Sequence, residues 1–243
     1  MTRRVDPIIQ AVRRLAEPLP RGRVFDIPGS SGAVRAALEP LGFTVVAGDL
    51  FDVGRTNIAG RLVQCDMTEP LPVRSASVDL AVSSEGIEHI SDAFAFLREL
   101  ARIVRPAGHL ILTTPNTLNL RARLAYLFAG QLNFRSALDE RSCFMGQRGD
   151  RIQHGHAFLR SYFQLRYLLH HAGFRIRGVT YSRLSPTAIV ASPLVPFIWL
   201  ATARVYQQEG RRHPGPHLRE IRGHALSAAL LYSKNIVLSA ERV

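Results

Sequence analysis

The chain has 243 residues, of which 47% are hydrophobic and 21% are charged. This composition excludes a disordered chain, and the length suits one ordinary folded domain with a substantial core. The net charge is +12, but the basic residues are scattered along the chain, in pairs at most. A solvated, arginine-rich surface is therefore favoured over a nucleic-acid interface.

The first part of the chain alternates short apolar runs with helical patterns. Asp6 to Glu17 has apolar residues at helical spacing and stops before two prolines, which predicts a helix packed on the edge of a sheet. A buried strand is expected over Arg23–Ile27, followed by a glycine-containing turn and a helix over Ala33–Glu39. Three further strands are expected, over Thr44–Gly48, Arg61–Cys65 and Val78–Ser83.

The same alternation continues to the last strand. Ser91 is placed to cap an amphipathic helix, and Pro106–Gly108 reads as a turn into the next strand. The remaining expected elements are a strand over His109–Thr114, helices over Leu118–Ala129 and Leu159–His171, and strands over Phe174–Tyr181 and Asn235–Arg242. Strands that alternate with helices at this spacing predict a parallel α/β sheet with right-handed crossovers.

Two segments do not fit this alternation. Gly130–Gly155 has no clean period, which predicts a loop-rich insertion at about 130–156 of a single domain covering 1–243. A second insertion, at about 183–234, separates the last two strands and opens with the uncharged stretch 184–203. That stretch is long enough to span a membrane, but three prolines interrupt it. We expect an apolar patch that contacts a membrane surface, with a dimer contact or additional core as the alternatives.

The cysteines and the N-terminal residues bear on the cellular compartment of the protein. Cys65 and Cys143 are isolated and lack metal-ligand spacing, so we interpret them as reduced thiols. The N-terminus has no apolar secretion signal. We therefore expect a cytoplasmic protein, at the inner face of the membrane if the apolar patch binds lipid.

The turn after the first strand has the features of a nucleotide-sized site. Asp26 ends the strand, and Gly29 and Gly32 allow a ligand to approach backbone N–H groups and a helix N-terminus. Asp49 and Asp66 follow the next two strands at the same sheet edge, where Asp49 is placed to accept hydrogen bonds from a ribose. The alternatives are glycines needed only for packing and two solvated loop acids. The glycine order is not G-x-G-x-x-G, which argues against a nicotinamide cofactor.

A second group of polar residues follows the strand over Val78–Ser83. Glu85 is placed to face the cofactor, and His89 is either a proton acceptor or a helix-capping residue. His154 and His156 are further candidates for the base. No cysteine or third histidine stands near them at ligand spacing, so we do not predict a metal.

Taken together, these segments resemble the class I S-adenosylmethionine-dependent methyltransferases. The resemblance rests on five segments in order, Val24–Gly32, Val45–Asp49, Cys65–Met67, Val78–His89 and Leu97–Asn116. It implies a Rossmann-like, doubly wound sheet of seven strands, mostly parallel with an antiparallel last strand, and helices on both faces. It also implies S-adenosylmethionine contacts at Asp26, Pro28, Gly29, Gly32, Asp49, Leu50, Asp66, Met67, Ser84 and Glu85.

The reaction implied is methyl transfer to an oxygen, or less readily a nitrogen, of a small-molecule, glycan or lipid-linked acceptor. His156, His154 or His89 would take the acceptor proton. The stretch from His154 to His156, with Ala172–Phe174, resembles a subgroup found with glycan and lipid-linked sugar biosynthesis. The chain lacks the Asn/Asp-Pro-Pro-aromatic motif of enzymes that methylate base nitrogens, which argues against a nucleobase acceptor.

The chain departs from the family pattern in its turns. Pro28 and Ser30 stand where glycine is usual, and Ala107 replaces a turn glycine. Proline removes an N–H, and the Cβ of serine narrows the path to a ligand, so we expect weaker cofactor binding. A catalytically inactive binding protein and an RNA methyltransferase are the alternative functions.

Overall fold

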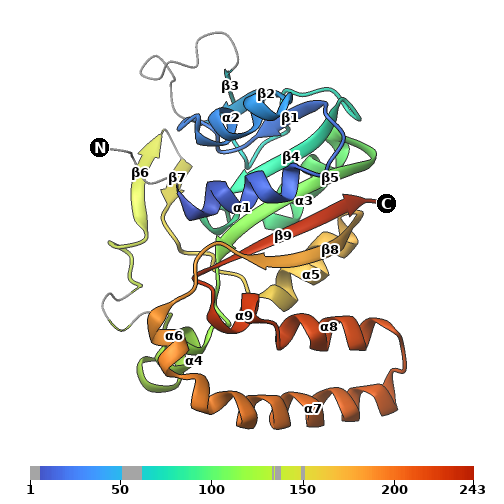
Figure 1. Cartoon of the computed structure of the whole chain (residues 1–243). Helices are drawn as coiled ribbons and strands as arrows, with labels where there is room; N and C mark the ends of the chain where they lie inside the picture. Colours follow the sequence, from blue (N-terminus) through green and yellow to red (C-terminus); the bar gives the residue numbers. More distant parts are fainter. Residues whose placement is uncertain (1–5, 51–61, 133, 135–137, 149–150) are drawn as a thin grey trace.

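A computed structural model of the chain describes residues 6–50, 62–132, 134, 138–148 and 151–243. Its centre is a seven-stranded sheet with the order β3-β2-β1-β4-β5-β9-β8 (Figure 1). The strands are β1 (Arg23–Asp26), β2 (Thr44–Asp49), β3 (Leu62–Gln64), β4 (Val78–Ser84), β5 (Val104–Pro115), β8 (Phe174–Tyr181) and β9 (Asn235–Arg242). β1 to β5 pair in parallel, whereas β9 runs antiparallel to both of its neighbours, β5 and β8. The expected Rossmann-like sheet with an antiparallel last strand is confirmed.

Helices cover both faces of this sheet because its central strands are apolar on both sides. Along β4, Leu80 and Val82 pack into one core cluster and Ala81 into the other, as expected when successive side chains alternate. One cluster is completed by α1 (Pro7–Ala16) and α2 (Ala33–Leu38), with the short η1 (Glu39–Leu41) after them. The other is completed by α3 (Ala93–Ile103) and α5 (Tyr162–His171).

The position of α1 differs from the prediction. It packs on a face of the sheet, over β5 and β9, and not on an edge. Its apolar stripe is buried with Ile111 and Val237 in the same core cluster. The residues of α1 could not show this, because strands β5 and β9 come much later in the chain.

The observed helix starts follow their capping residues. Asp92, and not Ser91, caps α3 by accepting from the Ala95 N–H at 2.9 Å. Asn119 caps α4 (Leu120–Ala129) and Ser161 caps α5, so both helices begin later than predicted. The expected turn at Pro106–Gly108 lies inside β5, where the register with β4 shifts.

Part of the predicted loop-rich segment is regular. β6 (Phe144–Arg148) and β7 (Arg151–His154) form a two-stranded antiparallel ribbon. Neither strand alternates apolar and polar residues cleanly, so periodicity could not reveal them. Positions 133, 135–137 and 149–150 of this segment, and Arg61 of the expected third strand, lie outside the described residues.

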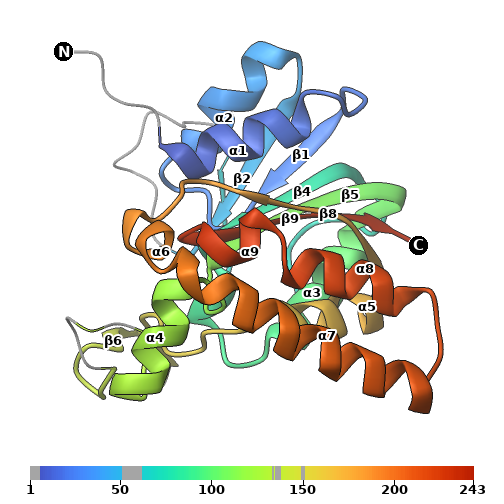
Figure 2. The same ribbon diagram turned by 60° about the horizontal axis from the view of Figure 1, so that its bottom comes forward.

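Helices fill the sequence between β8 and β9. They are α6 (Pro186–Val190), η3 (Ser192–Leu194), α7 (Val195–Arg212), α8 (His217–Ala225) and α9 (Ala228–Tyr232). α7 and α8 run side by side, with α7 outermost (Figures 1 and 2). α7 fully buries no residue, but its Val195 and Ile198 pack against a small core cluster of Leu120, Ala188 and Leu231. Part of the stretch 184–203 therefore adds to the core, as one of the alternatives expected. No helix in the described part of the chain combines the length and apolar character needed to cross a membrane.

Candidate functional site

A cavity of about 910 Å³ opens where β1 to β4 end. Parallel strands place their carboxyl ends at one sheet edge, and the loops that follow them form the cavity wall. Six expected cofactor residues line it, namely Pro28, Asp49, Leu50, Asp66, Met67 and Glu85. Its volume lies within the range of small-molecule sites.

The acids after β2 and β3 are held in defined positions. Asp49 is 4% exposed, and its Oδ2 accepts a hydrogen bond from the Ser30 N–H at 2.9 Å. Asp66 Oδ1 accepts from the backbone N–H and the hydroxyl of Thr68, at 2.8 and 2.7 Å. Two carboxylates from neighbouring strands therefore lie in one cavity wall, as the sequence predicted.

Four of the expected cofactor residues, Asp26, Gly29, Gly32 and Ser84, are not part of the cavity lining. A Cβ on Gly29 would lie 2.7 Å from both the Ala47 Cβ and the Asp26 carbonyl oxygen, so packing alone requires glycine there. Gly32 has φ 65° at the start of α2, a left-handed conformation that glycine adopts readily. Ser84 Oγ lies 3.3 Å from Thr113 Oγ1, within hydrogen-bonding distance.

Asp26 is buried behind the cavity. It is 1% exposed, and neither carboxylate oxygen has a hydrogen-bond partner within the described structure. Burial, and secondarily the charge of Asp49, raise the pKa of Asp26 well above its usual value. This carboxyl group is therefore favoured in its protonated form.

Glu85 lies where β4, β5 and β9 meet the cavity. Its backbone has φ 53°, and its carboxylate accepts from Thr113 Oγ1 at 3.1 Å and from Asn235 Nδ2 at 2.9 Å. Burial and the nearby Glu88 raise the pKa of Glu85 to about 8. The contact with Asn235 connects this loop to the start of β9.

The three candidate histidines gather on one side of the cavity. His89 belongs to the short η2 (Ile87–His89), and it lines the cavity together with His154. His156 is not part of that lining; its ring lies edge-on to His89, with 5.0 Å between ring centroids. Next to both His89 and His156 is Glu88, which is fully buried. One potential ligand atom from each of Glu88, His89 and His156 lies within 4.8 Å of those of the other two.

No third histidine stands near His154 and His156 along the sequence, but the fold supplies one. His89 comes from a distant part of the sequence, and the fold brings it beside His156. Sequence spacing could reveal only neighbours along the chain.

Sequence reasoning also missed Arg160, which holds the two sides of this histidine region together. Its guanidinium donates to four backbone carbonyls, those of Ile87, Phe158, Ile90 and Ser91. These distances are between 2.7 and 2.9 Å. A chain segment containing two of the histidines is thereby fixed against the loop containing the third.

Other residues of the cavity wall were also missed. They are Ile27, Gln64, Cys65, Thr68, Ile90, Ser91, Met145, Ile152 and Gln153. Pro28 and Ser30 border the open cavity, so neither closes it. Met145 and Ile152 belong to β6 and β7, which the sequence did not reveal.

A sequence profile described as a methyltransferase domain matches residues 1–179. A demethylmenaquinone methyltransferase of Clavibacter sepedonicus is 31% identical over 110 residues, covering 42% of this chain and 44% of the relative. A ubiquinone biosynthesis O-methyltransferase of Sinorhizobium fredii is 28% identical over 123 residues, covering 47% and 49%. The matches thus span less than half the length of these curated relatives.

The fold is also similar to a solved structure. An S-adenosylmethionine-dependent methyltransferase from Mesorhizobium loti aligns with a TM-score of 0.53 at 17% identity, covering 97% of this chain and 98% of that one. At this identity the likeness concerns the fold alone.

Proposed function

Because the chain belongs to the class I S-adenosylmethionine-dependent methyltransferases, we propose that it moves the cofactor's methyl group to an oxygen of a small, partly apolar acceptor. The observation that carries this proposal is that one cavity has two walls of different chemistry. Strand-end carboxylates form one wall, and histidines with apolar side chains form the other.

The cofactor lies along the carboxylate wall in this proposal. Asp49 accepts hydrogen bonds from the ribose hydroxyls, and Asp66 accepts from the adenine amino group. Leu50 and Met67 contact the adenine ring, since both line the cavity beside these acids. Asp26, Gly29 and Gly32 do not contact the cofactor in this proposal. They hold the conformation of the turn in which the Ser30 N–H donates to Asp49.

The acceptor lies against the opposite wall. Ile90, Met145 and Ile152 offer apolar surface there, and His154 offers a proton acceptor. Nδ1 of His89 is engaged with a backbone carbonyl, and His156 is outside the wall, so His154 is the base that we propose. As the acceptor oxygen bonds to the methyl carbon, the carbon–sulfur bond breaks, its electron pair stays on sulfur, and His154 takes the hydroxyl proton.

We propose that this acceptor is a hydroxylated ring joined to a lipid. The second relative above is named as an O-methyltransferase of ubiquinone biosynthesis, which supports a phenolic hydroxyl as the first acceptor to test. A sugar hydroxyl on a lipid carrier is the second. Both offer an apolar part for the wall around Ile152 and a hydroxyl for His154.

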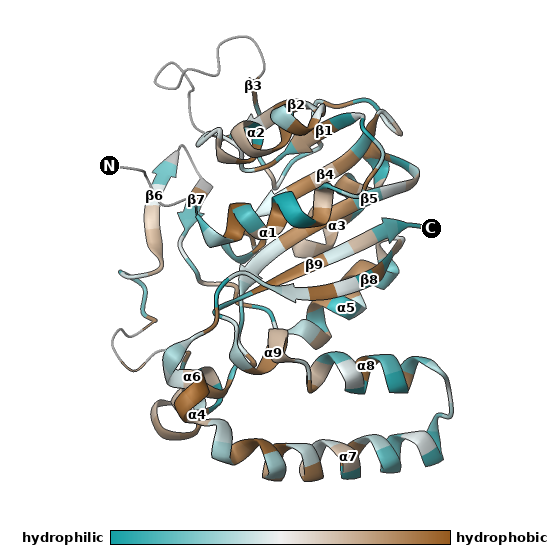
Figure 3. Cartoon of the chain, viewed as in Figure 1, coloured by the Kyte–Doolittle hydropathy of each residue, from teal (hydrophilic) through white to brown (hydrophobic). Residues whose placement is uncertain are grey.

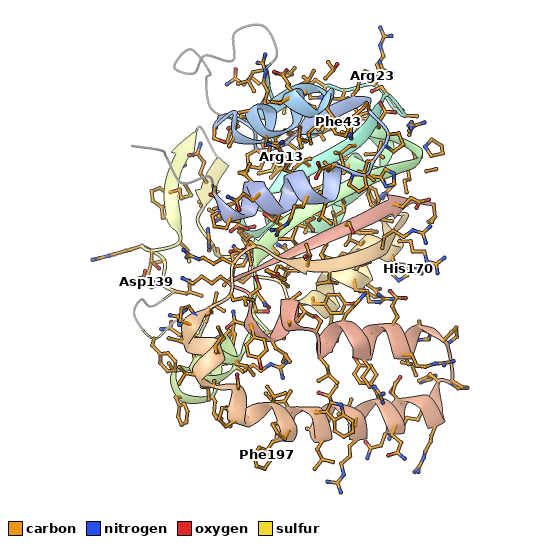
Figure 4. The ribbon with its side chains drawn as sticks, in the orientation of Figure 1. Arg13, Arg23, Phe43, Asp139, His170 and Phe197 are labelled. Atoms are coloured by element: carbon orange, nitrogen blue, oxygen red, sulfur yellow. The ribbon has the colours of Figure 1, made fainter. Side chains whose placement is uncertain are left out.

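A surface feature supports contact with lipid. In segment 183–234, an addition to the methyltransferase domain in this proposal, Val190 is 81% exposed and Phe197 is 72% exposed. The first half of α7 is apolar and its second half hydrophilic (Figure 3), and Phe197 projects from the outer side of α7 (Figure 4). Exposed arginines, Arg183 and Arg204, flank the patch. An apolar patch with basic neighbours suits the surface of an anionic membrane.

The cofactor assignment is tested by calorimetric titration with S-adenosylmethionine and S-adenosylhomocysteine. We expect binding by the wild type, and at least about a tenfold loss of affinity in Asp49→Ala, because a charged hydrogen-bond acceptor is removed. Glu17→Ala removes an exposed carboxylate and should bind like the wild type. Equal affinity of Asp49→Ala and the wild type would contradict the assignment.

The acceptor side is tested by transfer of a labelled methyl group to phenolic and lipid-linked sugar acceptors. We expect His154→Gln to lower kcat by about 100-fold or more, because a general base is lost, with cofactor affinity unchanged. Transfer to nitrogen acceptors only, or an unchanged kcat in this variant, would contradict the proposed chemistry.

A further inference from the structure

Glu88, His89 and His156 form a group of potential metal ligands beside the acceptor wall. One ligand atom from each lies within 4.8 Å of the other two. We propose that these three residues bind a divalent transition-metal ion. The ion would lie next to the place where the acceptor hydroxyl meets His154.

The spacing suits an ion with small adjustments. Nε2 of His156 is 4.0 Å from Oε1 of Glu88. Bonds from zinc to nitrogen or carboxylate oxygen are about 2.1 Å long, so two ligand atoms of a tetrahedral ion lie about 3.4 Å apart. His156 and Glu88 would therefore have to approach by roughly 0.6 Å, and His156 is half exposed, which leaves its side chain room for this movement.

One carboxylate oxygen of Glu88 accepts a hydrogen bond, and the other has no hydrogen-bond partner within the described structure. Glu88 is fully buried, and its Oε2 accepts a hydrogen bond from Thr114 Oγ1 at 3.0 Å. Its Oε1 is the oxygen without a partner among the described residues. Buried polar atoms nearly always have a hydrogen-bond partner or a bound ion, and a cation at this position would supply the missing partner of Oε1.

The ring of His89 is oriented by a backbone group. Its Nδ1 is 2.8 Å from the His154 carbonyl oxygen, which can only accept, so Nδ1 carries the proton. The lone pair available to a metal is then on Nε2. Histidine ligands typically donate their other N–H to a carbonyl or carboxylate in this way, and carboxylate ligands are hydrogen-bonded in turn.

The backbone holds the two halves of the group together. The Phe158 N–H donates to the carbonyl of Glu88 at 3.1 Å, and the Arg160 guanidinium joins both segments. The ligands therefore come from η2 and from the turn after β7, and these contacts fix the separation of the two segments before an ion arrives.

The donor set selects the class of ion. Two imidazoles and one carboxylate suit zinc, manganese or ferrous iron, whereas magnesium and calcium prefer oxygen ligands throughout. Bound here, the ion would act as a Lewis acid on the acceptor hydroxyl and make its proton easier for His154 to remove. This role rests on the proposed function, but binding of the ion does not.

The test uses the untagged full chain, freed of metal with a chelator and titrated with Zn²⁺, Mn²⁺ and Mg²⁺ in a calorimeter. We expect one equivalent of Zn²⁺ or Mn²⁺ to bind and Mg²⁺ to bind much more weakly. Glu88→Gln and His156→Asn should each lower the affinity at least tenfold. His213→Asn removes an exposed histidine and serves as the matched control.

His156→Asn keeps the test decisive if Glu88→Gln fails to fold, because His156 is half exposed. The visible spectrum of the Co²⁺ form gives a second readout, which His156→Asn should change and His213→Asn should not. Absence of binding by the wild type, or equal affinity in His156→Asn and His213→Asn, would overturn the proposal. Metal binding without methyl transfer would instead support the metal site and contradict the proposed reaction.

Discussion

Asp26, the last residue of β1, lies next to the cavity without being part of its lining. Its carboxyl group is buried under Gly29, whose Cβ would come within 2.9 Å of its Oδ2. It also lies close enough to Asp49 for that charge to oppose its ionisation. Ionisation of Asp26 therefore costs free energy in the folded protein that the unfolded chain does not incur.

We predict that Asp26→Asn changes how stability depends on pH. The pKa of Asp26 is higher in the folded protein than in the unfolded chain. Its contribution to the free energy of unfolding is therefore complete below about pH 3.9 and is lost as pH rises towards the folded pKa. Asn cannot ionise, so the variant should gain stability relative to the wild type from pH 5 to pH 8, by at most about 1.4 kcal/mol per pH unit.

Urea denaturation of the cofactor-free protein at both pH values measures this difference. Glu17→Gln removes an exposed carboxylate and controls for the change in net charge. A difference between wild type and Asp26→Asn that is the same at pH 5 and pH 8 would contradict the burial argument.

Ala107 offers a second test at the scale of one residue. It is exposed and has φ 58°, a conformation that costs an L-residue about 1–2 kcal/mol. Ala107→Gly should raise the free energy of unfolding by about 0.5–1 kcal/mol, after the greater flexibility of glycine in the unfolded chain is deducted.

Ala95→Gly is the matched control for this substitution. Ala95 is exposed in the regular helix α3, where glycine should cost about 1 kcal/mol. If both variants lose stability equally in thermal denaturation, the backbone at Ala107 is not strained.

At the scale of elements, the connection between η2 and the segment before α5 holds the histidine wall in place. Arg160 is the main link, because one side chain satisfies carbonyl groups on both sides of the gap. The Phe158 N–H adds a second link, to Glu88. Movement of this segment would separate His154 and His156 from His89.

We predict that Arg160→Met lowers the free energy of unfolding by about 2 kcal/mol, since hydrogen bonds from a charged donor are lost and carbonyls are left unsatisfied. Cofactor affinity should change little, because the Asp49 wall is not involved. Chemical denaturation and calorimetry measure the two effects. Arg98→Met is the control, as Arg98 is exposed on α3.

Regular elements with strong local signals could be predicted from the sequence. β8 and β9 have the predicted bounds, because apolar runs and glycine or polar residues define their ends. β6 and β7 could not be predicted, since each is short and gains its order from pairing with the other. The same division holds for the site, where Asp49 and Asp66 follow visible strands, but the contacts of Arg160 depend on tertiary structure.

For the whole molecule, the exposed apolar side chains of α6 and α7 lie beside those at the end of α4. Leu127 and Phe128 of α4 are 73% and 75% exposed, and α4 contacts α6. Patches of this kind mark interaction surfaces on folded proteins. This surface lies at one end of the molecule, away from β1 to β3 (Figure 1).

We predict that the wild-type protein floats with vesicles of phosphatidylglycerol and not with those of phosphatidylcholine, because both apolar contact and basic residues contribute. The double variant Phe197→Ser with Trp199→Ser should lose this binding and keep its thermal stability, since both side chains are about half exposed or more. Phe94→Ser, an exposed phenylalanine on α3, is the control.

Equal flotation of the double variant and the wild type would contradict membrane contact through α7. A shift of the wild type to a dimer in solution, abolished by the same double variant, would show that a second copy covers the patch.

The position of β9 has a consequence for how the protein is made. β9 follows β8, four α-helices and the short η3 in sequence, yet it pairs between β5 and β8. While the ribosome extends the chain through α6 to α9, the hydrogen-bonding edges of β5 and β8 both stay open. A chain that ended before Asn235 would thus leave strand edges of β5 and β8 unpaired, and unpaired edges of this kind readily pair with other chains.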